Sequence, residues 1–200
     1  MTELFQILAD FQPKLPGWCK TDKAVTLASI VLALRPEVSL EIGIYGGSSF
    51  LPIALAHKAI KFGVAIGIDP WSREVVMREQ TTEKDKEWWS TQNMNKLHDD
   101  FMQMLRDHKL EQFTKIVRKE SRVIDPPNAI GLLHIDGSHS DTAIYDVVKF
   151  APKVTNGGFC VTDDSNWTGG GVTKAEQRLI GFGFKKICAL QEGALWQRRS

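Results

Sequence analysis

The sequence has few cysteines, no excess of charge of either sign and no long apolar run, and each of these shortages narrows the range of functions. Its 200 residues carry 25 basic and 24 acidic side chains, which leaves a net charge of +1. Such a balance gives no electrostatic footprint for nucleic acid or for an anionic membrane surface. The longest apolar stretch, residues 27–34, is far too short to cross a bilayer. We therefore expect neither nucleic acid nor a membrane as a partner.

The three cysteines, Cys19, Cys160 and Cys188, are widely separated and lack the paired spacing of a zinc site. Cys160 and Cys188 stand in apolar runs typical of strands, and we interpret all three residues as reduced thiols of the core. The N-terminus carries Glu3 and Asp10 and lacks the basic segment of a secretory signal. These features predict a cytoplasmic protein.

Strand-like and helix-like segments alternate along the chain, after an N-terminal helical segment, residues 1–35, that ends at Arg35-Pro36. Two hundred residues suffice for one α/β domain, so we expect a single domain over residues 1–200. Such alternation predicts a parallel sheet covered by helices on both faces. Thr21 or Asp22 is the expected N-cap of the first long helix. The expected strands are residues 38–42, 63–68, 113–118, 130–135 and 158–162, and the expected helices are 21–34, 48–60, 91–108 and 141–154.

The C-terminus departs from this alternation. Residues 184–191 and 194–198 are both strand-like, and only Glu192-Gly193 separates them. Two strands joined so closely pair antiparallel, because a parallel crossover needs a dozen or more residues. Asn156-Gly157 follows a helical run, and we interpret it as a helix C-cap rather than a hairpin turn. The predicted fold class is therefore α/β: one doubly wound, Rossmann-like domain with a mostly parallel seven-stranded sheet and a C-terminal antiparallel hairpin.

The stretch from Val38 to Ser49 is the most informative about function. A short apolar strand containing Glu41 runs directly into a turn with three glycines, and an apolar helix follows. A strand, a glycine turn and a helix N-terminus together form a cradle for a polar ligand, because glycine allows close approach and the first helical N–H groups are free. The spacing Glu-x-Gly-x-x-Gly-Gly differs from the dinucleotide fingerprint Gly-x-Gly-x-x-Gly. The glycines are Gly43, Gly46 and Gly47.

Asp69 ends the next predicted strand, 26 residues after Gly43. In a doubly wound sheet an acidic side chain at this place accepts the two ribose hydroxyls of a nucleoside. The alternative is that Asp69 caps the loop beside Pro70. Trp71 would then pack on the adenine or roof the pocket, or else pack on its own domain.

Acidic side chains follow two further strands. Asp136 comes after the strand 130–135, and Asp163 and Asp164 come after the strand 158–162. Adjacent parallel strands bring their carboxyl ends to one edge of the sheet, where three carboxylates would repel one another unless a cation lay between them. Carboxylate oxygens suit Mg²⁺. The alternative is that these aspartates cap turns in separate loops.

His139 follows Asp136 by three residues in the same turn. A histidine with a pKa near 6.5 suits a general base at neutral pH, so we expect it to accept a proton from an acceptor hydroxyl held near Asp136. The alternative is a polar residue that opens the next helix. His134 lies inside the strand, and we interpret it as a core residue.

Together these motifs resemble those of a metal-dependent small-molecule O-methyltransferase of the class I S-adenosylmethionine (SAM) superfamily. The chain is similar to the macrocin O-methyltransferase and cephalosporin hydroxylase-like group, and more remotely to catechol O-methyltransferase. The likeness spans about residues 18–199 and includes the C-terminal hairpin. It depends on four segments: residues 41–48, 67–71, 134–139 and 157–164.

The resemblance implies specific roles. The glycine-turn motif would hold the methionine end of SAM, the acid after the second strand its ribose, and the residues after the third strand its adenine. An Mg²⁺ ion would bind at the aspartates, with His139 as base and Asp136 beside it at the reacting groups. The second metal position is Asp-Asp here, where relatives have Glu-Asp or Asp-Asn. The implied cofactor-binding residues are Glu41, Gly43, Tyr45, Gly46, Gly47, Ser48, Asp69, Trp71, Ser121 and Asp136, and the implied metal ligands are Asp136, Asp163 and Asp164.

Residues 71–98 fit neither the sheet nor its usual helices. Charge of both signs is followed by Trp88-Trp89, two neighbours that cannot share one helix face. A lid over the pocket or a contact between subunits of a homo-oligomer would explain them. We expect a SAM-dependent enzyme that methylates an oxygen of a small-molecule acceptor. The alternatives are an NAD(P)-dependent oxidoreductase and a non-catalytic or repurposed methyltransferase fold, such as a hydroxylase-like relative or a binding module.

Overall fold

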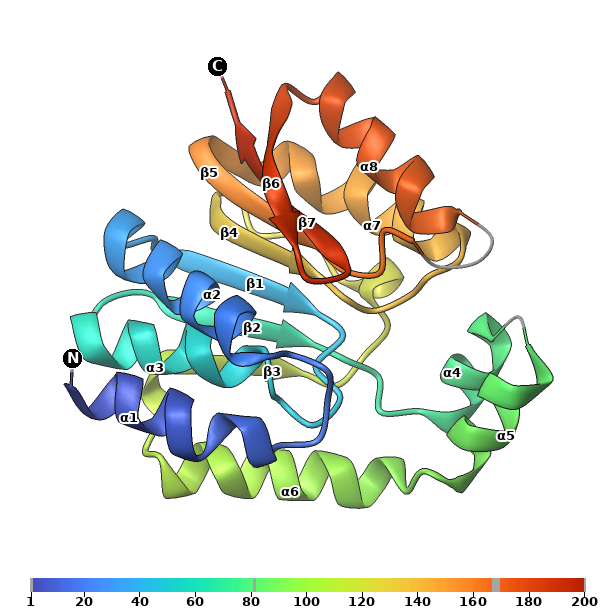
Figure 1. Ribbon diagram of the computed structural model, residues 1–200, viewed down its shortest axis with the longest axis horizontal. Coiled ribbons are helices and arrows are strands. Elements are labelled where there is room, and N and C mark those ends of the chain that lie inside the picture. Colours follow the sequence, from blue (N-terminus) through green and yellow to red (C-terminus); the bar gives the residue numbers. More distant parts are fainter. Residues whose placement is uncertain (1, 81, 167–169, 200) are drawn as a thin grey trace.

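A computed structural model describes residues 2–80, 82–166 and 170–199. Its sheet has seven strands in the order β3-β2-β1-β4-β5-β7-β6, and the first five are parallel. β7 pairs antiparallel with both β5 and β6 (Figure 1). The mostly parallel sheet with its C-terminal antiparallel hairpin is thus confirmed. The strands are β1 (Val38–Ile42), β2 (Val64–Ile68), β3 (Thr114–Val117), β4 (Ile130–Ile135), β5 (Val154–Thr162), β6 (Phe184–Leu190) and β7 (Gly193–Arg198).

Helices cover both faces of the sheet (Figure 1). One core cluster joins the sheet to α1, α2, α3 and α6, and the other joins it to α7 and α8. α4 and α5 lie beyond the carboxyl ends of the parallel strands. The helices are α1 (Thr2–Asp10), α2 (Thr21–Leu34), α3 (Phe50–Ile60), α4 (Arg73–Glu79), α5 (Glu83–Thr91), α6 (Met94–Asp107), α7 (Asp141–Phe150) and α8 (Gly171–Gly181).

Several local predictions were wrong. The residue before α2, Lys20, is its N-cap and makes no side-chain capping bond, so neither Thr21 nor Asp22 caps the helix. Asn156-Gly157 is not a C-cap, because β5 begins at Val154 and runs through both residues. The β4–β5 register shifts beside them, and Gly157 has a φ of 79°. β5 therefore begins earlier than predicted, with an irregular segment that the Asn156-Gly157 pair alone does not indicate.

The cysteines divide by their place in the fold. Cys19 and Cys160 are buried, as expected, but Cys188 is exposed. It lies on β6, the outermost strand of the sheet, whose middle residues are all exposed. An apolar sequence run did not distinguish an edge strand from a buried one. None of the helices in the described residues is long and apolar enough to cross a membrane.

Gly43 directly follows β1, at a point where no side chain fits. Its φ is +86°, and a Cβ atom there would lie 2.3 Å from the backbone oxygen of Asp136. Two loops, one after β1 and one after β4, therefore touch through their backbones. This close approach fixes the floor of the carboxyl edge of the sheet.

We expect Gly43→Ala to lower the free energy of unfolding by about 1–3 kcal/mol, because alanine brings both a strained φ and a clash. Chemical denaturation measures the loss. Gly181→Ala is the matched control, since nothing lies within 4 Å of a Cβ at that position, and it should be neutral or stabilising by up to about 1 kcal/mol. Equal stability of the two variants would contradict the packing argument.

Candidate active site

A pocket opens at the carboxyl ends of the parallel strands. The turns after β1, β2, β3 and β4 and the helix α4 contribute to its wall, as does the loop after β5. Ligands bind at this edge in doubly wound sheets, since the loops diverge there. Of the predicted site residues, those on the wall are Gly43, Tyr45, Ser48, Asp69, Trp71, Ser121, Asp136, His139 and Asp164.

Three predicted cofactor residues do not reach this wall. The carboxylate of Glu41 is fully buried, where it accepts a 2.6 Å hydrogen bond from Ser49 Oγ. A Cβ on Gly46 would clash with Pro16, and one on Gly47 with the ring of Phe101. These three residues support the turn through protein contacts, and their direct contact with a cofactor stays a prediction.

Asp69 ties the loops of the pocket together. Its Oδ2 accepts hydrogen bonds from the backbone N–H groups of Ile44 and Tyr45, both at 2.9 Å, and its Oδ1 accepts one from Trp71 N at 2.7 Å. Burial raises the pKa of Asp69, and these backbone N–H groups oppose the rise. A carboxylate has about four acceptor positions, so one remains for a ligand. Asp69 therefore caps the loop, as the alternative interpretation held, and its contact with a ribose stays a prediction.

Trp71 packs on its own domain. The side chain is 3% exposed, and its ring lies against Phe101 and His98. Its Nε1 donates a 2.9 Å hydrogen bond to the backbone oxygen of Tyr45. One edge of the ring still borders the pocket. Packing on its own domain is thus present and supports the glycine turn, and contact of Trp71 with an adenine stays a prediction.

Asp163 is bound to two basic side chains of the protein itself. Its Oδ2 forms an ion pair with the ammonium of Lys23, on α2, and lies 3.2 Å from His134 Nε2. Burial alone would raise the pKa of Asp163, but His134 and Lys23 hold it well below its usual range. The pocket wall does not include Asp163. The charge of Asp163 is thus balanced from within the protein, and its role as a metal ligand beside Asp136 stays a prediction.

His134 is part of the same buried group. Its Nδ1 lies 3.3 Å from Glu41 Oε2, and the residue is fully buried. Burial alone would lower the pKa of His134, but Glu41 and Asp163 raise it to about 10. The negative charges of Glu41 and Asp163 are thus balanced by the positive charges of His134 and Lys23. The interpretation of His134 as a core residue is confirmed.

His139 and Asp164 form a pair that faces the pocket. His139 Nε2 lies 2.7 Å from Asp164 Oδ2. Burial lowers the pKa of His139, although the charges of Asp163 and Asp85 oppose this. Burial likewise raises the pKa of Asp164 to about 6, together with the charges of Asp163 and Glu192. A neutral imidazole hydrogen-bonded to a carboxylate is the state that a general base requires.

Asp136 lies between the buried charges and the pocket. Burial and the neighbouring Asp163 raise its pKa well above the usual range. Ligand atoms of Asp136, His139 and Asp164 all lie within 4.8 Å of one another. Two of these donors are carboxylates that reach the pocket, which fits a divalent cation that keeps several of its waters. Asp136 and Asp164 therefore remain candidate metal ligands.

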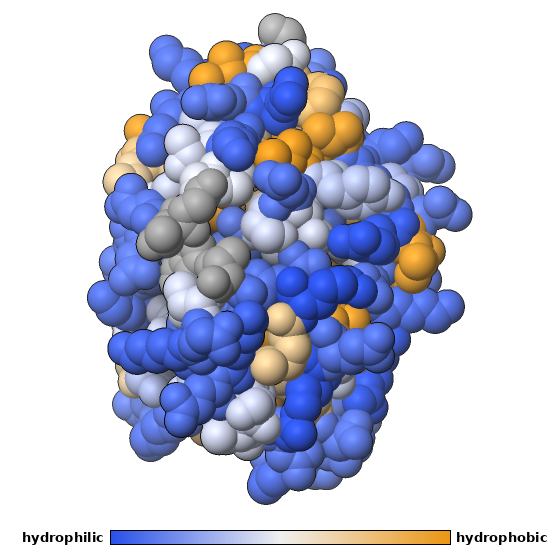
Figure 2. All heavy atoms as spheres, turned by 90° about the vertical axis from the view of Figure 1, so that its right-hand side faces the viewer, coloured by the Kyte–Doolittle hydropathy of each residue, from blue (hydrophilic) through white to orange (hydrophobic). Residues whose placement is uncertain are grey.

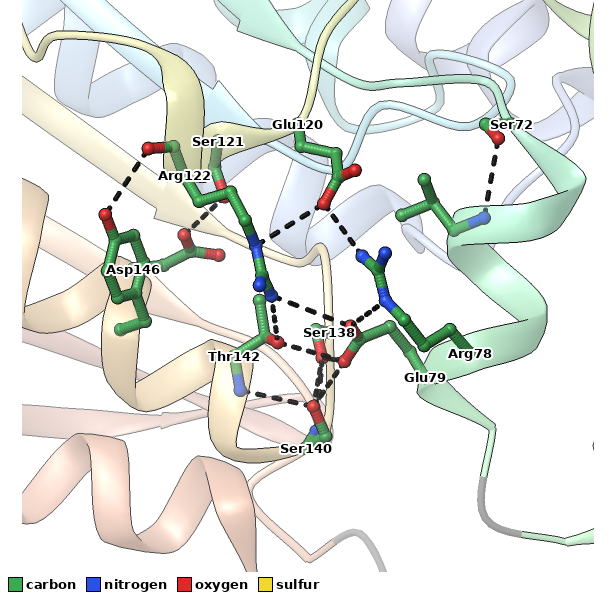
Figure 3. A network of polar contacts seen from close by, with 12 residues as sticks. Ser72, Arg78, Glu79, Glu120, Ser121, Arg122, Ser138, Ser140, Thr142 and Asp146 are labelled. Atoms are coloured by element: carbon green, nitrogen blue, oxygen red, sulfur yellow. Dashed lines mark hydrogen bonds and ion pairs between the residues drawn. The ribbon is translucent and has the colours of Figure 1, made fainter.

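Sequence reasoning missed a network of polar contacts between α4 and the loops after β3 and β4 (Figure 3). Glu79 Oε2 accepts hydrogen bonds from the hydroxyls of Ser138, Ser140 and Thr142. Arg78 and Arg122 pair with Glu120, and Arg122 also lies 3.9 Å from Glu79. Glu79 stood in a run of mixed charge that reads as a solvated helix face. Only Ser140, the N-cap of α7, could have been found from the sequence, as a serine opening a predicted helix.

An aromatic cluster fastens the other side of α5. Trp88 and Trp89 pack against Trp18 and Tyr45, with ring centroids 5.6–6.4 Å apart. Trp18 also stacks on Tyr45 at 5.4 Å. The N-terminal segment, the glycine turn and α5 thus meet at one point. Trp18, Tyr45 and Trp89 border the pocket.

The order of the strands and the pocket at their carboxyl edge are those of class I SAM-dependent methyltransferases. The chain belongs to the methyltransferase-domain family, whose model matches residues 40–165. No curated protein matches the chain. Membership of this family decides against a nicotinamide-dependent oxidoreductase.

Solved structures of O-methyltransferases share the fold over nearly the whole chain. The O-methyltransferase NovP has a TM-score of 0.74 and 15% identity, with 100% of this chain and 98% of that chain covered. A putative caffeoyl-CoA O-methyltransferase from Staphylococcus aureus has a TM-score of 0.65 and 14% identity, with 98% and 92% covered. TomG from Streptomyces achromogenes, solved in complex with SAM, has a TM-score of 0.58 and 14% identity, with 100% and 89% covered.

Ser121 Oγ donates a 2.6 Å hydrogen bond to Asp146 Oδ1, and both residues border the pocket (Figure 3). Burial raises the pKa of Asp146 to about 6, although Ser121, Arg122 and Lys149 oppose the rise. The folded state therefore holds the proton more tightly than the unfolded state, and stability falls as the pH rises through the window between about 4 and 6.

We expect Asp146→Asn to remove this decline, so that the variant is more stable than the wild type at pH 7.5 by about 1–3 kcal/mol. The asparagine oxygen still accepts from Ser121. Denaturation at pH 4, 6 and 7.5 measures the difference, and Asp125→Asn, at an exposed aspartate, serves as the control. A gap between variant and wild type that does not change with pH would contradict the assignment.

Proposed function

We propose that the protein transfers a methyl group from SAM to a hydroxyl oxygen of a small-molecule acceptor. The observation that carries this proposal is the His139–Asp164 pair, which shares one pocket with Asp69 and the glycine turn. A donor site and a proton acceptor in one cavity suit O-methylation in a chain of the methyltransferase family. The fold shared with O-methyltransferases supports it.

The proposed cofactor subsite lies over the turn after β1. Gly43, Tyr45 and Ser48 offer backbone and hydroxyl groups on the wall, and Asp69 has one acceptor position free for a ribose hydroxyl. Ser121 stands further along the same wall, where we place the adenine. When bound, SAM supplies the electrophilic methyl group. The protein's own task is to hold the acceptor oxygen in line with it and to take up the hydroxyl proton.

His139 is the proposed base. Asp164 orients its ring through the 2.7 Å contact and stabilises the imidazolium that forms when the proton is taken. Asp136, at the same edge of the pocket, would hold the acceptor hydroxyl within reach of His139. A divalent cation such as Mg²⁺, bound by Asp136 and Asp164, would lower the pKa of that hydroxyl.

We propose that α4 and α5 act as a lid. The Glu79 contacts fasten α4 on one side, and the aromatic cluster fastens α5 on the other. The face that carries these helices is largely hydrophilic and has only small, separate apolar patches (Figure 2). Such a surface favours a lid in contact with water over a large subunit interface.

The expectations about localisation, partners and oligomeric state stay proposals. We propose a cytoplasmic enzyme that acts without nucleic acid or membrane, on the grounds of its near-zero net charge and scattered thiols. A homo-oligomer would have to form through a surface other than the lid.

SAM or S-adenosylhomocysteine should bind with an affinity that Asp69→Ala weakens by about 1–3 kcal/mol, since a buried acceptor is removed from the ligand. Calorimetric titration measures the change. Asp107→Ala, at the far end of α6, is a control that should bind as the wild type does. Binding of NADH without SAM, or equal SAM affinity in all three proteins, would argue against the proposed site.

His139→Ala should reduce turnover by about 10²-fold or more, with SAM affinity little changed, because only proton transfer is lost. Turnover is measured by S-adenosylhomocysteine release with a panel of hydroxylated acceptors. His108→Ala is the matched control, since His108 packs on Phe11 and is not on the pocket wall. Unaltered turnover of the His139 variant between pH 6 and 9 would exclude this base.

A further inference from the structure

Two groups of side chains near the end of β4 have cation-ligand geometry, and they share Asp136. The inner group is His134, Asp136 and Asp163, and the outer group is Asp136, His139 and Asp164. Within each group the ligand atoms lie within 4.8 Å of one another. The outer group lies on the pocket wall, whereas His134 and Asp163 do not.

The inner group already holds a positive charge. The ammonium of Lys23 forms an ion pair with Asp163 Oδ2, and the same oxygen lies 3.2 Å from His134 Nε2. Lys23 is 2% exposed and comes from α2, 140 positions before Asp163. A lysine is almost never buried so completely unless it is paired. The inner group therefore contains a cation that the sequence itself supplies.

We propose that Lys23 is a positioning residue whose ammonium takes the place of a divalent cation in the inner group, so that the chain binds one divalent cation, held by the Asp136 and Asp164 carboxylates of the outer group. The inference rests on the metal-assisted form of the proposed function. Beyond that function, it assigns Asp163 to the ion pair with Lys23 and makes Lys23 the residue that limits the number of bound cations to one.

Electrostatics supports this division. A divalent ion in the inner group would stand within a few ångströms of the ammonium, where like charges repel strongly in a dry interior. Asp163 Oδ2 also has no position left for a metal once Lys23 and His134 are bound to it. If the ammonium were removed, Asp136 and Asp163 would share a buried space without a counter-charge, which is costly. A divalent cation bound there would then relieve the repulsion.

Mn²⁺ is a suitable probe because its free and bound forms differ in electron paramagnetic resonance, so bound ions can be counted without an activity assay. We expect the wild-type chain to bind one Mn²⁺ and Lys23→Met to bind two. Lys23→Arg restores the internal charge and should bind one. Lys20→Met, three residues earlier at the start of the same helix and exposed, is the matched control and should also bind one.

Removing single carboxylates locates each ion. Asp164→Asn should abolish binding in the wild type, whereas Asp163→Asn should leave one bound Mn²⁺. The double variant Lys23→Met/Asp163→Asn should return from two ions to one. The Asp163→Asn result tests the proposal even if Lys23→Met fails to fold, as judged by circular dichroism.

Two results would overturn the proposal: loss of wild-type binding in Asp163→Asn, or no gain of an ion in a folded Lys23→Met. Failure of the metal-assisted function gives a different pattern, in which the wild type binds no Mn²⁺ but Lys23→Met binds one that Asp163→Asn removes. That pattern would retain the role of Lys23 and discard the outer metal site.

Discussion

The buried contact between Lys23 and Asp163 is the constraint on which the rest of the site depends. Asp163 ends β5 and Lys23 lies in the first turns of α2, so the contact fixes the N-terminal helix against the carboxyl edge of the sheet. Both side chains are buried, and loss of either partner would leave the other uncompensated at a cost of several kcal/mol. His134, on β4, contacts both Asp163 and Glu41, so the charged group continues from β5 to β1.

This anchoring has consequences for the pocket above. With α2 held in place, the segment before it crosses the glycine turn, where the amide of Gln12 donates hydrogen bonds to the backbone oxygens of Cys19 and Ser48. Trp18 is thereby placed over Tyr45 and in contact with α5. The N-terminal segment, the glycine turn and α5 are therefore one connected structure.

The sequence predicted the features that depend on local order and missed those that depend on distant partners. Strand alternation and the short link before β7 were enough for the sheet, and the strand ends correctly brought Asp69, Asp136, His139 and Asp164 to one pocket. The sequence could not predict the partner of Asp163, because Lys23 lies in an ordinary amphipathic helix far away along the chain. Glu79 was hidden in a mixed-charge run for the same reason. Cys188 was placed in the core because an apolar strand pattern does not tell the centre of a sheet from its edge.

The wide separation of Lys23 and Asp163 along the chain also bears on how the protein is made. Contacts between residues 140 positions apart require a long loop to close, and such contacts form slowly. During synthesis, α2 and β1 emerge long before β5, so Lys23 has no counter-charge until most of the chain has left the ribosome. Until then, burial of the lysine would leave its charge without a counter-charge, which is costly. The charge balance beneath the pocket therefore requires the C-terminal part of the chain, although Lys23 itself comes from its beginning.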